Sequence, residues 1–388
     1  MSRSIALLSG KGGSGKTTFA LALANMLSSC KIKVLLVDCD IVTNGATYFY
    51  EDRLSGDNPV ASFFDLLYSK DVKVFSPMEI VPSYYYFIPS IHNITNDITD
   101  SHPFDPQIKQ EFKELYSIWE KDFDVILFDC SAGYSDVLHY VVPEADINLV
   151  VLESDKVSMA AMRSLYLKLG PILNKTKFYQ IFNKVRPEEV DEYKRRDGTF
   201  FTSIGAIAFD WSIRDAFAVA DVPTLDNTGI DFGMQLNNIC STLFEGNSYL
   251  SKLKQYGLEL SLRKVRIEQE ETRSSFINYR SDRKKPFWPQ MTAIWIPLLI
   301  LSSISLLLLL LLGSGLFPLG FGDLTSSKES ILVTIIAAFA TNILGSILIF
   351  FESSTSSKER RLKLKAYEDQ LNSQQERINK IKRMLEKS

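Results

Sequence analysis

Cysteine and histidine are scarce in this chain, and neither is arranged as a metal site. The 388 residues contain four cysteines and three histidines. No two cysteines form a C-x-x-C pair, and neither residue type has the spacing of metal ligands, so the sequence indicates no zinc or iron–sulfur site. Isolated cysteines are typical of a reducing compartment rather than of a disulfide-linked fold.

A strong excess of one charge is also missing. The formal net charge at pH 7 is −3 and the sequence pI is about 5.8, so bulk charge does not favour nucleic-acid binding. An apolar run at residues 5–8 predicts a first strand, and we expect no cleavable signal peptide before it. The length predicts one or two soluble domains with additional segments.

The most specific motif is a glycine-rich loop near the N-terminus. Residues 10–17, GKGGSGKT, match the phosphate-binding pattern G-x-x-x-x-G-K-[ST] at every position. The loop lies between the expected strand and a helical run at residues 19–27, so its backbone N–H groups and the helix N-terminus can converge on phosphates. Lys16 would pair with the β- and γ-phosphates, and the Thr17 hydroxyl would bind Mg²⁺. The expected phosphate-binding residues are Gly10, Lys11, Gly12, Gly13, Ser14, Gly15, Lys16, Thr17 and Thr18.

Lys11 is a second lysine inside the loop, where an ordinary phosphate-binding loop does not require one. GKGGSGKT resembles the deviant phosphate loop of the MinD/ParA family of ATPases, and Lys11 occupies the position of the family's signature lysine. In the family this lysine reaches across a nucleotide-sandwich homodimer to the partner's ATP. The resemblance implies an ATPase that uses ATP and Mg²⁺ and couples dimerisation to hydrolysis, with Lys11 and Lys16 as catalytic residues.

Two further apolar runs each end in an acidic residue. Residues 33–38 read as a strand buried on both faces of a parallel sheet, and Asp38 and Asp40 follow at its carboxyl end, where such sheets bind ligands. Residues 124–129 have the Walker B pattern, whose closing carboxylate, Asp129, binds Mg²⁺. By resemblance to the family's first switch segment, Asp40 would position the attacking water and Asp38 would help to organise the Mg²⁺ shell. The alternative is that Asp38 and Asp40 only cap a loop.

Three later segments extend the resemblance. Residues 129–133, DCSAG, resemble the family's second switch, whose backbone senses the γ-phosphate. Asn183 ends a further strand and resembles the residue that reads the adenine edge, because an amide carries a donor and an acceptor; an Asn in a turn is the alternative. Residues 204–210 resemble the last strand, which makes Asp210 a candidate nucleotide contact, although Ala208 stands where the family usually has proline.

The order of elements predicts the fold class. Strands alternate with helices, without hairpin signals between them, so residues 1–245 are predicted to form an α/β, doubly wound, mostly parallel sheet of the P-loop NTPase type. The glycine loop and the acids then fall at the carboxyl ends of strands. Residues 246–288 are predicted to form a charged helical connector.

The composition changes abruptly after the connector. Residues 289–352 are expected to form a transmembrane hairpin with spans at about 291–312 and 331–351, because each apolar stretch is long enough to cross a bilayer. Lysines and arginines flank the hairpin, whereas the loop at 313–330 contains only Lys328. The positive-inside rule therefore places the ATPase domain and both termini in the cytoplasm and the loop outside, at the inner membrane. A buried soluble helix is the alternative.

Residues 353–388 are predicted to form a cytoplasmic helical tail with a short coiled coil. Its seam residues follow alternating four- and three-residue steps: Leu364, Tyr367, Leu371, Gln374, Ile378, Ile381 and Leu385. A single amphipathic helix packed on the ATPase domain is the alternative.

These features favour a membrane-anchored, MinD/ParA-like ATPase switch. ATP would close the homodimer, and slow, partner-stimulated hydrolysis assisted by Asp40 would reopen it. An unidentified protein would be recruited through the tail.

Three alternatives stay open. A tyrosine kinase of the polysaccharide-export type would carry its hairpin before the ATPase domain and a terminal tyrosine cluster, and this tail has only Tyr367. A DNA-partition ATPase would need a basic patch. Acids at 188–192 interrupt the candidate one, which consists of Lys184, Arg186, Lys194, Arg195 and Arg196. In a scaffold, ATP would be structural.

Overall fold

The computed structural model describes residues 2–54, 60–69, 76–91, 105–170, 177–194, 201–224, 227–281 and 358–387, together with residues 300 and 304. It divides into two compact units, Met1–Arg263 with Arg383–Ser388, and Lys264–Lys382. Apart from residues 300 and 304, the predicted spans and the loop between them lie outside the described residues. Among the residues that are described, no helix is both long and apolar enough to cross a bilayer.

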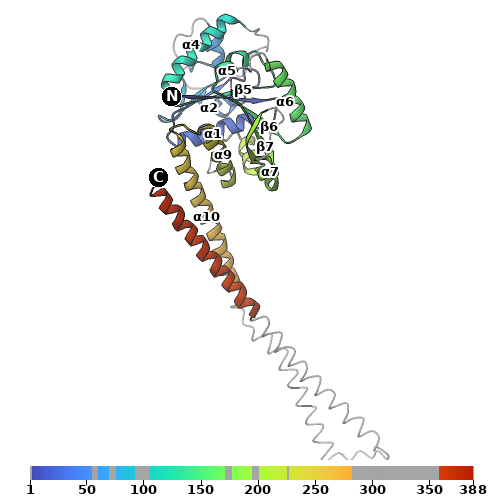
Figure 1. Ribbon diagram of the computed structural model, residues 1–388, viewed down its shortest axis with the longest axis vertical. Helices are drawn as coiled ribbons and strands as arrows, with labels where there is room; N and C mark the ends of the chain where they lie inside the picture. The colour runs from blue at the N-terminus through green and yellow to red at the C-terminus, as the bar shows by residue number, and fades with distance from the viewer. Residues whose placement is uncertain are drawn as a thin grey trace, which may run out of the picture. The chain divides into compact units, whose positions relative to one another are not determined.

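An eight-stranded sheet forms the core of the first unit (Figure 1). In spatial order its strands are β3 (Met78–Val81), β4 (Tyr85–Ile88), β2 (Val34–Asp38), β5 (Val125–Ala132), β1 (Arg3–Ser9), β6 (Ile147–Glu153), β7 (Lys177–Val185) and β8 (Thr202–Ala208). Neighbouring strands are parallel except β3 and β4, so the predicted mostly parallel α/β sheet is confirmed. The antiparallel edge strand β3 was not predicted. It is joined to β4 by a tight turn in which Ser83 has a positive φ of 67°.

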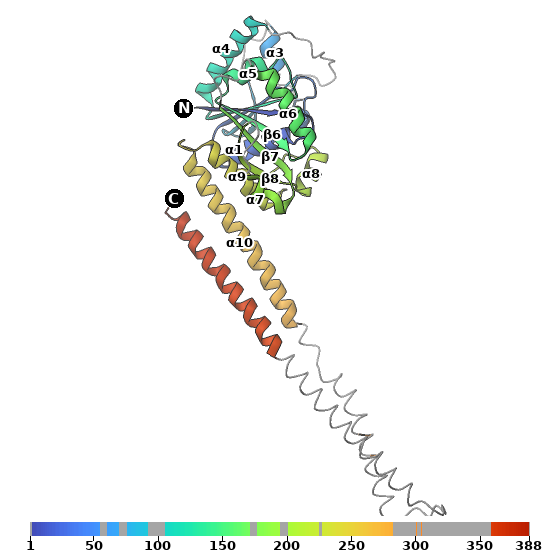
Figure 2. The same ribbon diagram turned by 45° about the vertical axis from the view of Figure 1, so that its right-hand side comes forward.

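Helices cover both faces of this sheet (Figure 2). They are α1 (Lys16–Ser29), α2 (Glu51–Leu54), α3 (Phe63–Tyr68), α4 (Pro106–Asp122), α5 (Leu138–Glu144), α6 (Lys156–Leu169), α7 (Val190–Lys194), α8 (Trp211–Ala218) and α9 (Ile230–Leu243), with short 3-10 turns η1 (Thr47–Tyr50) and η3 (Pro187–Glu189). Side chains of α1 and α9 pack on one face, and those of α3 to α7 pack on the other. Coverage on both faces explains why the central strands are continuous apolar runs.

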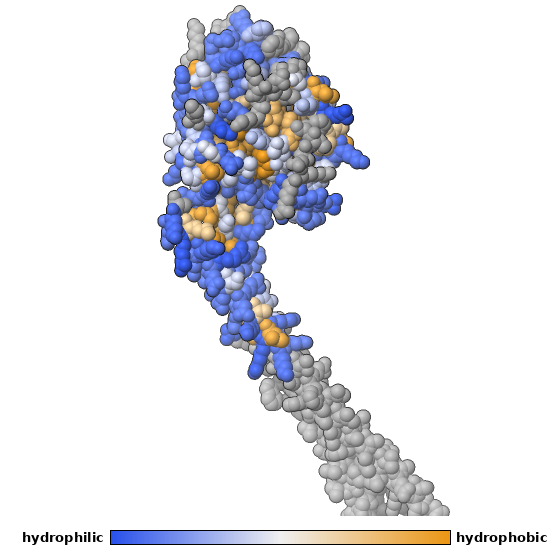
Figure 3. Space-filling model, viewed as in Figure 1, coloured by the Kyte–Doolittle hydropathy of each residue, from blue (hydrophilic) through white to orange (hydrophobic). Residues whose placement is uncertain are grey.

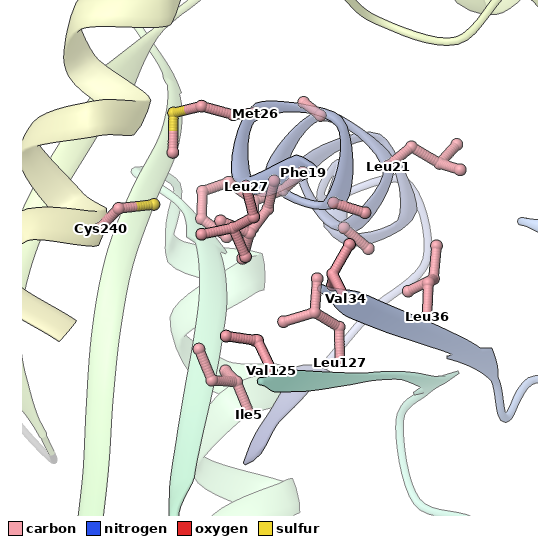
Figure 4. Close-up of a cluster of buried hydrophobic side chains, with 14 of the residues drawn as sticks. Ile5, Phe19, Leu21, Met26, Leu27, Val34, Leu36, Val125, Leu127 and Cys240 are labelled. Atoms are coloured by element: carbon pink, nitrogen blue, oxygen red, sulfur yellow. The ribbon is translucent and has the colours of Figure 1, made fainter. Parts of the chain in front are cut away.

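Helix α1 is anchored along most of its length, which fixes the glycine loop that precedes it. Figure 4 shows Phe19 and Leu27 of α1 lying over Ile5, Val125 and Leu127 of the sheet, and all five side chains are buried. Each such side chain contributes roughly 1.5–3 kcal/mol when it is fully buried. Because α1 starts directly after the loop, this packing also fixes the direction in which its first turn faces the site.

Two antiparallel helices make up most of the described part of the second unit. The later part of α10 (Leu250–Ser281) lies beside the C-terminal helix, residues 358–385, and residue numbers rise along one helix as they fall along the other. Arg377 pairs with Glu268 at 3.6 Å, Gln374 donates to the Thr272 hydroxyl at 3.2 Å, and the Tyr279 ring contacts Tyr367.

The predicted seam of the tail therefore faces α10 of the same chain. Tyr367, Gln374 and Ile378 belong to that seam, and Gln374 and Ile378 are almost completely buried. The face of the two helices that is visible in Figure 3 is mostly hydrophilic, as expected when the apolar residues face each other. Pairing of the tail with a second copy stays a prediction.

Candidate functional site

The glycine loop lines a cavity of about 630 Å³ at the carboxyl edge of the sheet. Its lining includes most of the expected site: Lys11, Gly12, Gly13, Ser14, Gly15, Lys16, Thr17, Thr18, Asp40, Asn183 and Asp210. Gly10 lies against the backbone of α6. Asp38, the last residue of β2, and Asp129, its register partner within β5, are fully buried. A cavity of this size is in the range that holds small ligands and cofactors.

Lys16 and Asp129 form a buried ion pair. The Lys16 ammonium lies 2.6 Å from Asp129 Oδ1, and the two residues are 5% and 0% exposed. Burial opposes the charge on Lys16, but the Asp129 carboxylate outweighs it, so the pKa of Lys16 is raised above its usual value. The phosphate-loop lysine is therefore held in its charged form at the edge of the cavity.

The second oxygen of Asp129 supports a metal role. Asp129 Oδ2 is buried and has no hydrogen-bond partner among the described residues. An unpaired buried carboxylate oxygen is costly unless a donor or a cation meets it. Mg²⁺ prefers oxygen ligands, and Thr17 in the first turn of α1 offers a hydroxyl at the cavity that Lys16, the partner of Asp129, also lines. The residues present therefore fit the predicted Mg²⁺ site.

Both carboxylate oxygens of Asp38 accept hydrogen bonds from the loop that follows β2, residues 39–47, which we call the first switch loop. Oδ1 accepts from the Asp40 N–H at 3.0 Å, and Oδ2 accepts from the Thr47 N–H at 2.8 Å and the Thr47 hydroxyl at 2.7 Å. Burial and the nearby Asp129 charge raise the pKa of Asp38 above the usual range. This geometry favours an indirect part for Asp38 in a Mg²⁺ shell, through the loop that it orients.

Asp40 lies at the cavity with its carboxylate held in one orientation. It is 6% exposed, and it accepts from both the N–H and the hydroxyl of Thr43. A carboxylate held in this way can accept a hydrogen bond from a water in the cavity. Its expected part in positioning the attacking water stays a prediction.

Asn183 and Lys184, at the end of β7, hold the glycine loop from outside. Asn183 Nδ2 donates to the Ser14 carbonyl at 2.8 Å, and Lys184 Nζ donates to the Gly13 carbonyl. The bond to Ser14 uses one of the two N–H groups of the Asn183 amide, so the predicted contact with adenine stays compatible with it. Lys184 had no assigned place in the expected site.

Asp210 joins two segments at the far side of the cavity. Its side chain caps α8 by accepting from the Ser212 N–H at 2.9 Å, and it accepts from the Gly229 N–H at 3.1 Å. Arg214 stacks over the Trp211 ring nearby, 5.0 Å from its centroid, and both line the cavity. A nucleotide contact by Asp210 stays a prediction, whereas its capping bonds are a clear local function.

Lys11 points to two acids of its own protomer. Its ammonium lies 2.9 Å from Glu153 Oε2 and 3.1 Å from Asp155 Oδ2. Neither acid was among the expected site residues. A signal was nevertheless present, because residues 147–153 form an apolar run that ends in an acid, as the runs before Asp38 and Asp129 do.

The candidate basic patch is largely neutralised where it is described. Lys184 pairs with Glu153 at 2.8 Å, Arg186 with Glu189 at 3.4 Å, and Lys194 with Asp191 at 3.0 Å. Residues 195 and 196 lie outside the described part of the chain. These pairs agree with the expectation that interleaved acids weaken a nucleic-acid surface here.

Comparison with known proteins gives three findings. Residues 2–179 match the family model described as an AAA domain. A protein of Guillardia theta described as a septum site-determining MinD is 26% identical over 203 residues, which cover 49% of this chain and 66% of that relative's length. A structure of a plasmid partition protein from Borrelia burgdorferi B31, bound to AMPPNP, aligns with a TM-score of 0.51 and 18% identity, over 63% of this chain and 99% of that one.

A further solved structure, of the MinD cell-division protein from Aquifex aeolicus, aligns with a TM-score of 0.48 and 20% identity, over 64% of this chain and 98% of that one. The partition protein shows the shared fold, and the family model spans the glycine loop and both acid-ended strands. Together with the GKGGSGKT loop and the cavity beside it, the family model and the Guillardia theta relative make the N-terminal unit similar to P-loop ATPases of the MinD type.

Proposed function

We propose that this chain is a membrane-anchored ATPase switch. Binding of ATP with Mg²⁺ closes a homodimer through Lys11, and hydrolysis reopens it. The observation that carries the proposal is that the charged Lys16 and the oriented carboxylate of Asp40 line one cavity beside the glycine loop, and that Lys16 pairs with Asp129, whose second oxygen has no partner among the described residues. Phosphoryl transfer depends mainly on such positioning and charge stabilisation.

Each of these residues has one task in the proposed reaction. Lys16 transfers its contact from Asp129 to phosphate oxygens, in a buried setting where charge interactions are strong. Thr17 and Asp129 would hold Mg²⁺, which would supply charge neutralisation at the phosphates. Asp40 accepts a hydrogen bond from the attacking water and fixes its direction of approach. Turnover is slow until a protein partner, recruited through the C-terminal tail, stimulates it.

The membrane attachment rests on the apolar stretches at 291–312 and 331–351. The antiparallel pairing of α10 with the C-terminal helix supports it, because a two-span hairpin leaves and returns on the same side of a bilayer. The charge pattern supports a cytoplasmic location for this side, where ATP is available. Two spans do not release from a bilayer, so the switch changes its dimer state within the membrane.

The decisive experiment compares ATP turnover of the full-length protein in detergent with that of Asp40→Ala, and measures the dimer fraction in parallel. We expect Asp40→Ala to lose roughly 100-fold or more in turnover and to accumulate as an ATP-bound dimer. Asp52→Ala is the control, because Asp52 is an exposed acid on α2 that takes no part in the cavity. Equal turnover of Asp40→Ala and Asp52→Ala would reject the catalytic assignment of Asp40, and a dimer fraction indifferent to ATP would favour a scaffold.

A further inference from the structure

The ammonium of Lys11 is held by two acids that come from different elements. Glu153 is the last residue of β6, and Asp155 is the N-cap of α6. The Asp155 carboxylate is itself fixed, because it accepts from the Ser158 N–H and the Ser158 hydroxyl, each at 2.8 Å. Lys11 therefore meets a prepared pair of carboxylates rather than a mobile surface acid.

Glu153 is shared between two lysines. Its Oε2 faces Lys11 at 2.9 Å, and its Oε1 faces Lys184 at 2.8 Å. Lys184 in turn donates to the Gly13 carbonyl. The charges alternate along this row, from Asp155 through Lys11 and Glu153 to Lys184, and the row ends on the backbone of the glycine loop.

The electrostatics favour the closed arrangement of this row. Hydrogen bonds from Lys11 to Glu153 and Asp155 raise the pKa of Lys11 above its usual value, so the lysine stays charged and attracted to both acids. The side chains of Lys11, Glu153 and Asp155 are 30%, 21% and 42% exposed. Pairs with this exposure are individually weak and are screened by salt, so they can be exchanged for other contacts.

We propose that Glu153 and Asp155 are positioning residues that hold Lys11 within its own protomer, so that closure of the ATP dimer requires both ion pairs to break. This inference rests on the proposed function, in which Lys11 crosses to the partner's nucleotide. Glu153 keeps its contact with Lys184 when Lys11 leaves, so the glycine loop stays tied to β7 throughout. The two acids thus set how readily the dimer closes, without touching the reacting phosphates.

The test uses the full-length double variant Glu153→Gln and Asp155→Asn. Both changes remove charge with little change of shape, and Asn keeps the N-cap of α6. The control is Glu189→Gln with Asp191→Asn, which removes the same charge from two exposed ion pairs nearby that do not contact Lys11. We expect the dissociation constant of the AMPPNP–Mg²⁺ dimer, measured by analytical ultracentrifugation, to fall roughly tenfold in the double variant and to stay unchanged in the control. High salt should reduce this difference, because it screens the pairs in the wild-type chain.

A second readout follows Lys11 itself. The rate at which an amine-reactive ester acylates Lys11, measured by mass spectrometry without nucleotide, should rise in the double variant and also in Asp155→Asn alone, which leaves Lys184 paired. A general loosening of structure would raise acylation of Lys184 and Lys252 in the single variant as well, and that result would overturn the inference. Weaker dimerisation of the double variant would also overturn it, because the acids would then assist closure. Absence of an AMPPNP-dependent dimer in the wild-type chain would instead reject the proposed function.

Discussion

Asn183 Nδ2 occupies the space that a Cβ atom on Gly15 would need, since the two atoms would be less than 3.0 Å apart. Gly15 also has a φ of 86°, in the left-handed region that favours glycine. The same amide donates to the Ser14 carbonyl. The close approach of β7 to the glycine loop is therefore possible because residue 15 has no side chain.

The substitution Gly15→Ala should damage the loop in two separable ways. The φ value costs an L-residue roughly 1–2 kcal/mol, and the contact with Asn183 adds a displacement of that amide. We expect ATP affinity to fall at least tenfold and the free energy of unfolding to fall by about 1–3 kcal/mol, measured by calorimetry and urea titration. Adding Asn183→Ala to Gly15→Ala should restore only the part of the lost ATP affinity and stability that is due to the contact with Asn183. Gly170→Ala is the control, since nothing lies within 4 Å of the Cβ position there; an equal loss in both variants would contradict the explanation.

The ion pair between Lys16 and Asp129 predicts a large effect on stability. Lys16→Met leaves the Asp129 carboxylate buried without a partner, and breaking a buried pair on one side costs about 3–5 kcal/mol. The double variant Lys16→Met with Asp129→Asn should regain most of the lost stability, because it leaves no uncompensated buried charge. Urea denaturation without nucleotide measures both values. Lys194→Met is the control: it breaks an exposed pair and should lower the free energy of unfolding by less than about 1 kcal/mol. If Lys16→Met lowered it by a similarly small amount, water would have to reach the Asp129 carboxylate.

Asp155 should make a contribution to stability that depends on pH in one direction. Hydrogen bonds from Ser158 lower the pKa of Asp155 below its usual value, so its stabilising effect is present above the unfolded-state pKa of about 4 and is lost as the pH falls through the folded-state value. Loss of an N-cap costs about 1 kcal/mol. We expect Asp155→Ala to be less stable than the wild type at pH 7 and the difference to shrink as the pH falls below 4. Asp155→Asn, which keeps the cap, should show a smaller loss at pH 7, and a difference that grows at low pH would contradict the assignment.

The cysteines predict a low background for thiol labelling. All four are buried, and burial raises the pKa of Cys30 to about 12 and the pKa values of Cys39 and Cys240 well above their usual range. The folded protein should therefore react with thiol reagents only after denaturation. This makes Ser326→Cys a clean test of topology in intact cells, where an impermeant reagent should label it and should not label Ser354→Cys. Labelling of Ser354→Cys alone would reverse the orientation.

Local motifs made the centre of the site predictable. The glycine loop fixes Lys16 and Thr17 relative to a helix, and a strand that ends in an acid places its carboxylate at the edge where parallel strands end. Asp38 and Asp129 are thus neighbours in register on β2 and β5. The partners of Lys11 were not predictable in the same way, because a motif says which lysine is present and not which acid it meets.

Other elements were missed for physical reasons that differ from case to case. Helix α4 was not predicted, although Asp105 as N-cap and a proline in the first turn are a clear signal for its start. The seam of the tail was recognised, but a pattern of apolar steps shows that a face will be covered and not which helix covers it. In the structure that helix is α10.

The three hydrogen bonds of Asp38 have a consequence for how the first switch loop opens. The backbone N–H groups of Asp40 and Thr47 lie near opposite ends of this loop, and both donate to the same carboxylate. Loss of that single side chain would expose both amides together. The loop should therefore behave as one cooperative unit of hydrogen exchange, in which its two ends open with the same free energy.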